Sequence, residues 1–303
     1  MNAKASFIQS QHDKFTRCLT TFREFLSDSD VSSLTIRNNN VIAEFKKPRL
    51  SLYINEKDQR SIGIETLNFK VYEKNDSHMI YGILKWLQQN FQNPIFFDVG
   101  ANEGIYTISA AIEGSRVHAF EAAPETYKRL NANLKLNSVT NIRTENIAVS
   151  DETGTTRFIY CPEVSGSSSF KNILDLKESI SIEVDTITLD EYCERNSVMP
   201  NFVKIDVEGA ELKVIKGFVK GISSERRPIL FVEILRKWSE KYGYKANDLM
   251  KLILDNGYSA YVYEPSEGMK KVEEIEEMTV QTNFLFLPTN IKHSGILEQI
   301  AIE

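Results

Sequence analysis

Cysteines are few in this sequence and lie far apart. Among its 303 residues only Cys18, Cys161 and Cys193 are cysteines, and they form no CxxC pair and no Cys/His pattern of a zinc site. This spacing offers no disulfide framework, which favours a reducing compartment. No stretch of 18 apolar residues is present, so we expect no membrane span. The N-terminus lacks the continuous apolar core of a signal peptide, and we therefore expect a cytoplasmic protein.

An excess of basic residues is also missing. The chain has 36 Lys and Arg against 42 Asp and Glu, a formal net charge of −6. Nucleic-acid-binding proteins usually present a basic face, so we expect no nucleic-acid partner. The four histidines form no convincing Ser-His-Asp arrangement, which argues against a hydrolase. His118 lies in an apolar strand and is expected to be a buried histidine with a hydrogen-bond partner rather than a base.

The first 75 residues differ in pattern from the rest. Apolar residues recur at three- and four-residue spacing over 6–29, which predicts an amphipathic helix whose stripe packs against the main body. The large side chains of this stripe are Phe7, Phe15, Leu19, Phe22 and Phe25. Residues 33–55 alternate with period two, which predicts a hairpin and a further strand. Residues 1–75 are therefore expected to form a helical and β-rich extension.

From residue 76 onward, strands and helices alternate. After a helix over 77–91, the expected strands are IFFDVG (95–100), VHAFEA (117–122), NIRTENIAVS (141–150), FVKIDVE (202–208), PILFVEI (228–234), YSAYVYE (258–264) and TNFLFLP (282–288). This alternation predicts an α/β domain over 76–303, with a doubly wound, mainly parallel sheet. The last two strands have no obvious helix between them, which allows an antiparallel final pair.

A glycine-containing loop follows the first strand of this domain. It runs Asp98-Val-Gly100-Ala-Asn102-Glu-Gly104, at the edge of the sheet where ligands bind in doubly wound folds. A dinucleotide loop has the pattern G-x-G-x-x-G, whereas this one has G-x-x-x-G with Asn102 in the middle. An acid at the start of the loop repels phosphate but suits a cationic ammonium group. The loop therefore favours a ligand such as S-adenosylmethionine, which carries an ammonium, a sulfonium and no phosphate.

A second acid, Glu121, ends the next strand, 23 residues after Asp98. A carboxylate at that distance can accept hydrogen bonds from both hydroxyls of a ribose. Either acid alone is explained as well by a helix cap or by surface charge. The two together, at neighbouring strand ends beside a glycine turn, indicate a nucleoside site.

Several blocks of this domain resemble one known family. They are FFDVGANEGIYTIS, VHAFEAAPETYKRLNANLKLN, NIAVSDETG, ITLDEYC, FVKIDVEGAELKVIKG, PILFVEI and NFLFLP. In this order, over residues 72–288, they are similar to the FkbM family of S-adenosylmethionine-dependent O-methyltransferases. The resemblance implies a seven-stranded sheet of the class I methyltransferase type with an antiparallel last strand. Two positions depart from the family: Ala122 stands where a proline is frequent, and Glu103 where an apolar residue is.

The resemblance also implies a cofactor site. The methionine end of S-adenosylmethionine would be lined by Asp98, Gly100, Ala101, Asn102 and Gly104. Glu121 would hold the ribose. The adenine would lie near Ala122, Asn146 and Ala148.

The block VKIDVEGAELKVIKG contributes further acids. Asp206 ends the fourth strand, where it could hold the cofactor's ammonium, accept a substrate proton or ligate a metal. Methyl transfer to an alcohol needs orientation and help in removing the proton, and the candidates are Asp206, Glu208 and Glu233. Glu211 is explained by stabilisation of the first helical turn. The three acids could also ligate Mg²⁺, but nothing in the sequence makes their side chains converge, so we predict no metal.

The leading hypothesis is an O-methyltransferase acting on a hydroxyl of a sugar, a glycan or a related small molecule; the sugar is implied by the resemblance alone. The segment CPEVSGSSSFKN (161–172) is either a surface connection or a loop over a polar substrate, and the resemblance favours the loop. One alternative is a nicotinamide-dependent oxidoreductase, against which the missing G-x-G-x-x-G counts. Others are a methyltransferase of a peptide, polyketide or lipid, and a non-catalytic binding module. The lack of an N/D-P-P-Y/F motif argues against methylation of nucleic acid.

Overall fold

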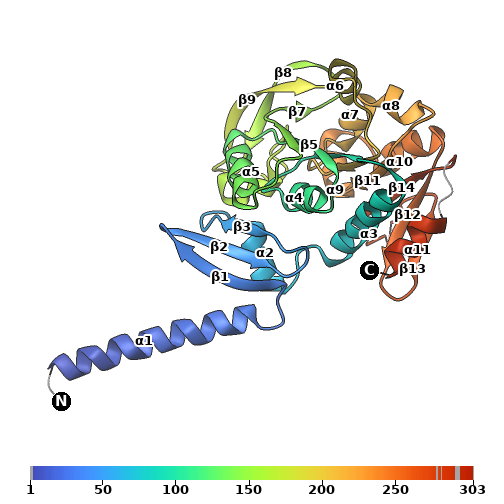
Figure 1. Cartoon of the computed structure of the whole chain (residues 1–303). Helices are drawn as coiled ribbons and strands as arrows, with labels where there is room; N and C mark the ends of the chain where they lie inside the picture. The colour runs from blue at the N-terminus through green and yellow to red at the C-terminus, as the bar shows by residue number, and fades with distance from the viewer. Residues whose placement is uncertain (1–2, 278, 281, 291–293, 303) are drawn as a thin grey trace.

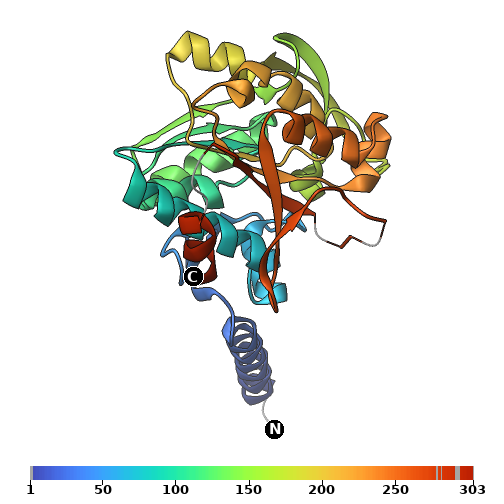
Figure 2. The same ribbon diagram turned by 90° about the vertical axis from the view of Figure 1, so that its right-hand side faces the viewer.

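Three parts of the chain are visible in the computed structural model, which describes residues 3–277, 279–280, 282–290 and 294–302. A large sheet with helices on both faces forms the main body (Figure 1). A small three-stranded sheet lies against one side of this body, and a long N-terminal helix projects from the small sheet. Turning the molecule by 90° shows the same helix pointing away from the body (Figure 2).

The main sheet has, within the described ranges, eight strands in the order β13-β12-β14-β11-β10-β4-β5-β6. Their bounds are β4 Ile95–Val99, β5 Arg116–Phe120, β6 Ile142–Glu145, β10 Phe202–Ile205, β11 Ile229–Glu233, β12 Tyr258–Glu264, β13 Gly268–Val272 and β14 Asn283–Pro288. The neighbouring strands β6, β5, β4, β10 and β11 pair in parallel in this order. Strand β14 runs antiparallel between β11 and β12. This inserted strand distinguishes the class I methyltransferase type from the plain dinucleotide-binding order, so the expected fold class is confirmed. The edge strand β13 is an addition that the sequence patterns did not predict.

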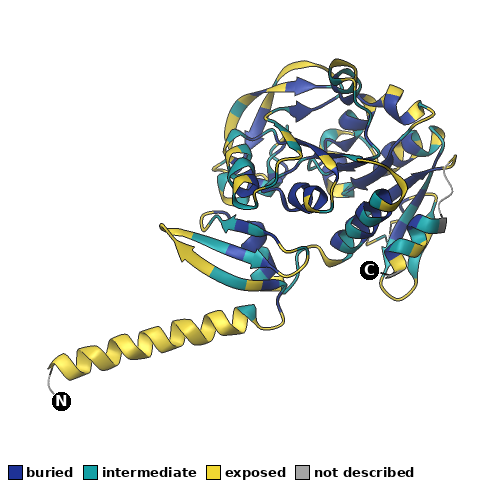
Figure 3. Ribbon diagram, in the orientation of Figure 1, coloured by how far each residue is buried: buried dark blue, intermediate teal, exposed yellow. Residues whose placement is uncertain are grey.

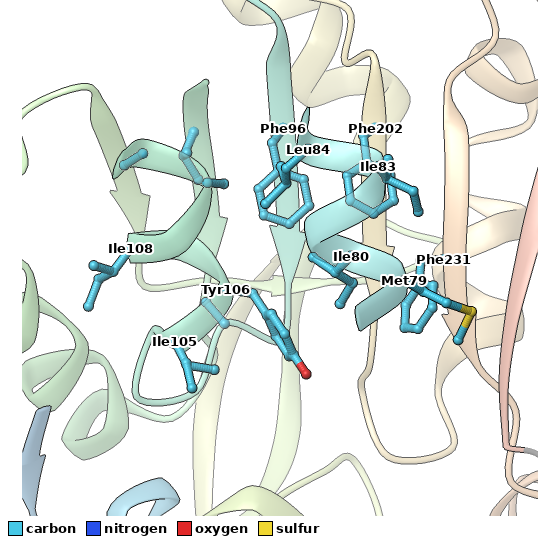
Figure 4. Packing of buried hydrophobic residues seen from close by; sticks show 14 of the residues in the cluster. Met79, Ile80, Ile83, Leu84, Phe96, Ile105, Tyr106, Ile108, Phe202 and Phe231 are labelled. Atoms are coloured by element: carbon cyan, nitrogen blue, oxygen red, sulfur yellow. The ribbon is translucent and has the colours of Figure 1, made fainter. Parts of the chain in front are cut away.

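One face of the sheet is covered by α3 (Lys74–Asn90) and α4 (Ile105–Ile112), with α11 (Ser294–Ile302) packed beside α3. Phe96 of β4 stacks on Phe202 of β10 with ring centroids 5.0 Å apart, and side chains of α3 lie over both rings (Figure 4). The neighbouring residues Phe97 and Val203 point to the opposite face. Because both faces are buried, the strands are apolar along their whole length rather than alternating, as is typical of parallel sheets.

The opposite face carries most of the remaining helices. They are α6 Leu189–Asn196, α7 Glu211–Lys216, α8 Val219–Ser223, α9 Arg236–Tyr242 and α10 Ala246–Asp255, while α5 Pro124–Leu136 follows β5. His118 on β5 is buried here, and its Nδ1 lies 2.8 Å from the hydroxyl oxygen of Tyr192. The expectation of a buried histidine with a hydrogen-bond partner is confirmed.

The prediction of one strand over 141–150 is wrong. The segment forms β6 and then β7 (Ala148–Val149), which leaves the main sheet and pairs with β9 (Ile180–Ile187). Asn146 interrupts the strand, because its Nδ2 donates to the carbonyl oxygens of Glu121 and Ala122 at the end of β5. Strand β8 (Gly154–Tyr160) completes this second sheet, and a short 3-10 helix, η1 (Pro162–Ser167), follows it.

The N-terminal extension contains β1 (Val31–Arg37), β2 (Asn40–Phe45), β3 (Ser51–Ile54) and α2 (Ile62–Phe69). The hairpin and the third strand were predicted, and all three strands pair antiparallel. Two asparagines, one in α5 and one at its C-cap, dock this sheet on the body: Asn133 Oδ1 accepts from Tyr53 N, and Asn137 Oδ1 accepts from Ser51 N. Backbone N–H groups of the edge strand β3 thus donate to side chains of the main body at positions where they would otherwise pair with a further strand. The division of the chain at residue 75 stays a prediction.

Helix α1 (Ala3–Leu26) confirms the predicted amphipathic helix, but its expected packing is wrong. None of its residues is buried, and Figure 3 shows it exposed along almost its whole length. In the part of the chain that the structure describes, its C-terminal end is fastened by Lys70 Nζ, which donates to the carbonyl oxygen of Glu24. The turn at 27–30 then leads directly into β1, so the helix leaves the body instead of lying on it. Of the helices in the described ranges, none is long and apolar enough to cross a membrane.

The docking of the extension predicts a loss of stability for Asn133→Ala. Asn133 is buried and also donates from Nδ2 to the carbonyl oxygen of Glu103, so its removal leaves Tyr53 N and this carbonyl without partners. We expect the free energy of unfolding to fall by about 1–3 kcal/mol in urea titrations. Lys135→Ala, at an exposed position of the same helix, should change it by less than about 0.5 kcal/mol. Equal values for the two variants would contradict the docking role.

Candidate functional site

A pocket of about 220 Å³ lies at the carboxyl ends of β4, β5, β10 and β11, where the strand order reverses. Ligands bind at this switch point in doubly wound folds. Of the residues expected from the sequence, eight line the pocket: Gly100, Asn102, Glu121, Ala122, Ala148, Asp206, Glu208 and Glu233. Asp98, Ala101 and Gly104 are buried beside the pocket without lining it, and Asn146 is exposed outside it.

The glycine loop is held between the ends of two strands. Backbone N–H groups of Gly100 and Ala101 both donate to the carbonyl oxygen of Phe120, each at 3.0 Å. Gly100 has φ +84°, and a Cβ at this position would lie 1.8 Å from the carbonyl oxygen of Asp206. Any side chain at Gly100 would therefore force β4 and β10 apart at the point where they form the pocket.

Asp98 lies under the loop in a dry environment. Its Oδ2 accepts from Thr107 Oγ1 at 2.5 Å, and its Oδ1 is buried without a hydrogen-bond partner among the described residues. Burial raises the pKa of Asp98, while the ammonium of Lys204 acts in the opposite direction. Asn102 Oδ1, in the same loop, is a second buried acceptor that finds no donor in the described chain. The loop thus places one unpaired acceptor, Asn102 Oδ1, at the pocket wall and a second, Asp98 Oδ1, beneath it.

Glu121 is held at the tip of β5 by two backbone donors. Its Oε2 accepts from Asn102 N and its Oε1 from Ala123 N, both at 2.9 Å. Burial raises its pKa to about 7, against the effect of these two hydrogen bonds. The wall beside it is apolar and consists of Phe120, Ile147, Ala148, Val149 and Phe158. A carboxylate beside a flat apolar cleft suits a ribose joined to a purine.

The three proposed catalytic acids converge at the other end of the pocket. Asp206 and Glu208, from the loop between β10 and α7, and Glu233, at the end of β11, all line it. Removal from water raises the pKa of Glu208 to about 8, and the charges of Asp206 and Glu211 add to this effect. Removal from water, followed by the charges of Asp206 and Glu208, raises the pKa of Glu233 well above its ordinary value. Glu211 points elsewhere, because its Oε1 accepts from Gly209 N, as expected for a structural acid.

Residues of the N-terminal extension also line the pocket, which the sequence did not reveal. They are Arg60, Glu65, Tyr72 and Glu73. They lie between the predicted strands and the predicted helix, in a stretch with no motif to single them out. The serine segment contributes Ser165, Gly166, Ser168, Ser169 and Phe170, so the expectation that it lies on the substrate side agrees with its position.

A buried ionic cluster joins the extension, the glycine loop and the serine segment. Asp58 is fully buried; it lies 3.5 Å from Arg129 Nη2 and accepts from the backbone N–H and the hydroxyl of Ser165. Glu103 of the loop accepts from Ile62 N at 2.9 Å and lies 3.7 Å from Arg129 Nε. Glu103 stands where an apolar residue is frequent in the family, and its carboxylate accepts a hydrogen bond from the extension. In the part of the chain that the structure describes, no group of three His, Cys, Asp or Glu side chains is arranged to hold a metal ion.

Comparison with known families agrees with this architecture. A model of the methyltransferase FkbM domain matches residues 98–260, more than half of the chain. The chain belongs to the FkbM methyltransferase family. The match starts at Asp98 and ends in β12, so it contains the glycine loop, Glu121 and the acids of β10 and β11, and the resemblance is confirmed. The extension lies outside it.

Two curated relatives are similar to this family domain. The 31-O-demethyl-FK506 methyltransferase FkbM of Streptomyces tacrolimicus is 32% identical over 41% of this chain and 58% of its own length. The hexuronic acid methyltransferase AglP of Haloferax volcanii is 31% identical over 46% of this chain and 55% of its own length. This chain thus spans a little over half the length of these relatives. A solved O-methyltransferase of Klebsiella pneumoniae superposes with a TM-score of only 0.38 at 9% identity, over 70% of this chain and 78% of that one, so the fold assignment rests on the strand order above.

Substitution at Gly100 tests the close approach of β4 and β10. Gly243 is a matched control, because it has nearly the same φ (+83°) but no atom within 4 Å of the point that a Cβ would occupy. Gly243→Ala should therefore cost only the backbone strain, about 1–2 kcal/mol of unfolding free energy. Gly100→Ala should cost clearly more in the same thermal or urea unfolding, and similar losses at the two sites would contradict the clash.

Proposed function

We propose that this chain is an S-adenosylmethionine-dependent O-methyltransferase that methylates a hydroxyl group, and that the acceptor is a sugar or a related polar molecule. The observation that carries this proposal is the polarity of the pocket: unpaired acceptors at the glycine loop, a carboxylate beside an apolar cleft at β5, and three acids at the far end. Membership in the FkbM family supports the methyl transfer.

The residues present fit S-adenosylmethionine. Glu121 would accept hydrogen bonds from the ribose hydroxyls, and Phe120, Ala148 and Phe158 would contact the adenine. Asn102 Oδ1 and the carboxylate of Asp206 would face the ammonium of the methionine part. Bound there, the cofactor supplies an electrophilic methyl group on a sulfonium. The acid-rich wall favours such a cation over a phosphate-bearing nicotinamide cofactor.

The acids at the far end are suited to orient an acceptor hydroxyl. Glu208 lines the pocket beside Trp238 and has a positive φ of 54°, a strained backbone conformation of the kind found at functional sites. A carboxyl with a pKa of about 8 is mostly protonated at neutral pH and becomes a stronger base than an ordinary carboxylate once it ionises. We assign Glu208 the removal of the acceptor's proton, with Asp206 and Glu233 as hydrogen-bond partners of the acceptor or of Glu208.

The acceptor class is inferred from the wall and from the relatives. Carboxylates, serine hydroxyls and Arg60 offer many hydrogen bonds, as a polyhydroxylated molecule requires. One relative is named as a methyltransferase of hexuronic acid, a sugar derivative, and another as a methyltransferase of 31-O-demethyl-FK506. Transfer of a labelled methyl group to panels of sugars, polyketides, peptides and lipids identifies the class.

Cofactor binding is the decisive test. Wild type should bind S-adenosylmethionine and not NAD in calorimetry, and Glu121→Gln should weaken binding roughly 10- to 100-fold, because it removes a charged acceptor of the ribose hydroxyls. Glu125→Gln, an exposed acid of α5 paired with Lys128, is the matched control and should bind as wild type. Binding of NAD without binding of S-adenosylmethionine would exclude the proposed function.

The role of Glu208 predicts a pH dependence. Because its pKa is raised to about 8, the basic form is gained as pH rises, so kcat/KM should increase with pH through this region. Glu208→Gln should abolish the increase and lower kcat roughly 100-fold or more at the alkaline end. Glu240→Gln, an exposed acid of α9, should keep the wild-type profile. An increase that survives in Glu208→Gln would assign the proton removal to another group.

A further inference from the structure

Helix α1 carries an apolar stripe that nothing in the described chain covers. Its exposed side chains and their exposed fractions are Phe7 64%, Ile8 57%, Phe15 70%, Leu19 55%, Phe22 48% and Phe25 39%. Six large apolar side chains on one helix face are unusual for a solvated helix, and an exposed patch of this kind marks an interaction surface. We propose that α1 docks on an anionic lipid surface by lying in its plane.

The charges of the helix are arranged around the stripe in a way that fits this partner. At 3.6 residues per turn, Lys14 and Arg23 lie at the two edges of the stripe. Asp13 and Glu24 lie on the opposite side, away from it, together with Arg17. An interfacial helix needs basic residues at the height of the lipid headgroups and apolar side chains below them. The helix thus presents cations to the membrane and keeps its acids in water.

A second copy of the chain is a poorer partner for the same stripe. In a two-helix seam the residues flanking the apolar positions meet across the interface, and pairs of opposite charge stabilise it. Here both flanks carry cations, Lys14 and Arg23, and neither of the helix's two acids lies on a flank to pair with them in a second copy. Gln11 and His12 also interrupt the apolar positions in the first half of the helix. The negatively charged surface of a membrane has the complementary sign.

Attachment of α1 at its C-terminal end leaves the stripe exposed and separates the main body from the surface that the stripe would bind. Lys70 fixes the C-terminal end of α1 through the carbonyl oxygens of Glu24 and Phe25, and Asp30 N donates to the carbonyl oxygen of Lys70. Figures 1 and 2 show the helix projecting from the extension in both views. Since the chain as a whole has a charge of −6, an arm that holds the body away from an anionic surface reduces repulsion.

Vesicle flotation with the full chain tests the proposal. Vesicles of phosphatidylcholine in which about a third of the lipid is phosphatidylserine should bind at least about ten times more protein than pure phosphatidylcholine vesicles, and salt should weaken binding. Phe15→Ser/Phe22→Ser should reduce binding to the anionic vesicles about tenfold or more. Ile112→Ser/Ile180→Ser is the matched control, because it removes side chains of 44% and 48% exposure elsewhere on the molecule, and it should bind as wild type.

Two controls separate this proposal from other outcomes. Unchanged unfolding midpoints of both double variants show that the fold is intact, whatever cofactor the pocket binds. Binding that is equal on neutral vesicles, or equal in the two double variants, would overturn the proposal. So would a wild type that ignores vesicles but forms a dimer which Phe15→Ser/Phe22→Ser dissociates, because the stripe would then bind a second copy.

Discussion

A single buried cation, Lys204, is the interaction on which the pocket depends. Its Nζ lies 2.9 Å from Asp206 Oδ2 and 5.3 Å from the centre of the Tyr106 ring. Burial opposes its charge, but the carboxylates of Asp206, Asp98 and Glu73 outweigh this effect and raise the pKa of Lys204. Without this ammonium, acids at the ends of β4 and β10 would repel one another in surroundings of low polarity. Because β10 lies beside β4, Lys204 serves as counter-ion for the acids that end both strands, Asp98 and Asp206.

The glycine loop is constrained on both sides, by close packing at Gly100 and by ionic contacts at Glu103. The ionic contacts make the extension part of the site. The loop after β4 can approach the end of β10 only because Gly100 has no side chain. Its far side is then held by Glu103, which bonds to the start of α2 and approaches Arg129. Asp58 binds the same guanidinium and also Ser165 of the insertion. The family domain and the two segments that cover its pocket are therefore joined at one buried cluster.

The sequence predicted what depends on local pattern and missed what depends on distant contacts. Strand and helix alternation predicted the main sheet, and paired acids around a glycine turn predicted residues that the structure places in one pocket. Strand β7 was missed because Asn146 turns the chain through bonds to the end of β5. Arg60 and Glu73 were missed because their place in the wall results from the docking of the extension on α5. The exposure of α1 could not be predicted either, since an apolar stripe has the same pattern whether or not the rest of the chain covers it.

The electrostatics of the pocket link cofactor binding to acceptor activation. The described wall contains six carboxyl side chains and two basic ones, Arg60 and Lys237. The raised pKa values of Glu121, Glu208 and Glu233 mean that the wall holds protons which a neutral or anionic ligand would leave in place. A cationic ligand favours the ionised forms, so these carboxyls would release protons when it binds. Glu208 would then be ionised most readily when the methyl donor is present, which makes proton removal from the acceptor depend on a loaded cofactor site.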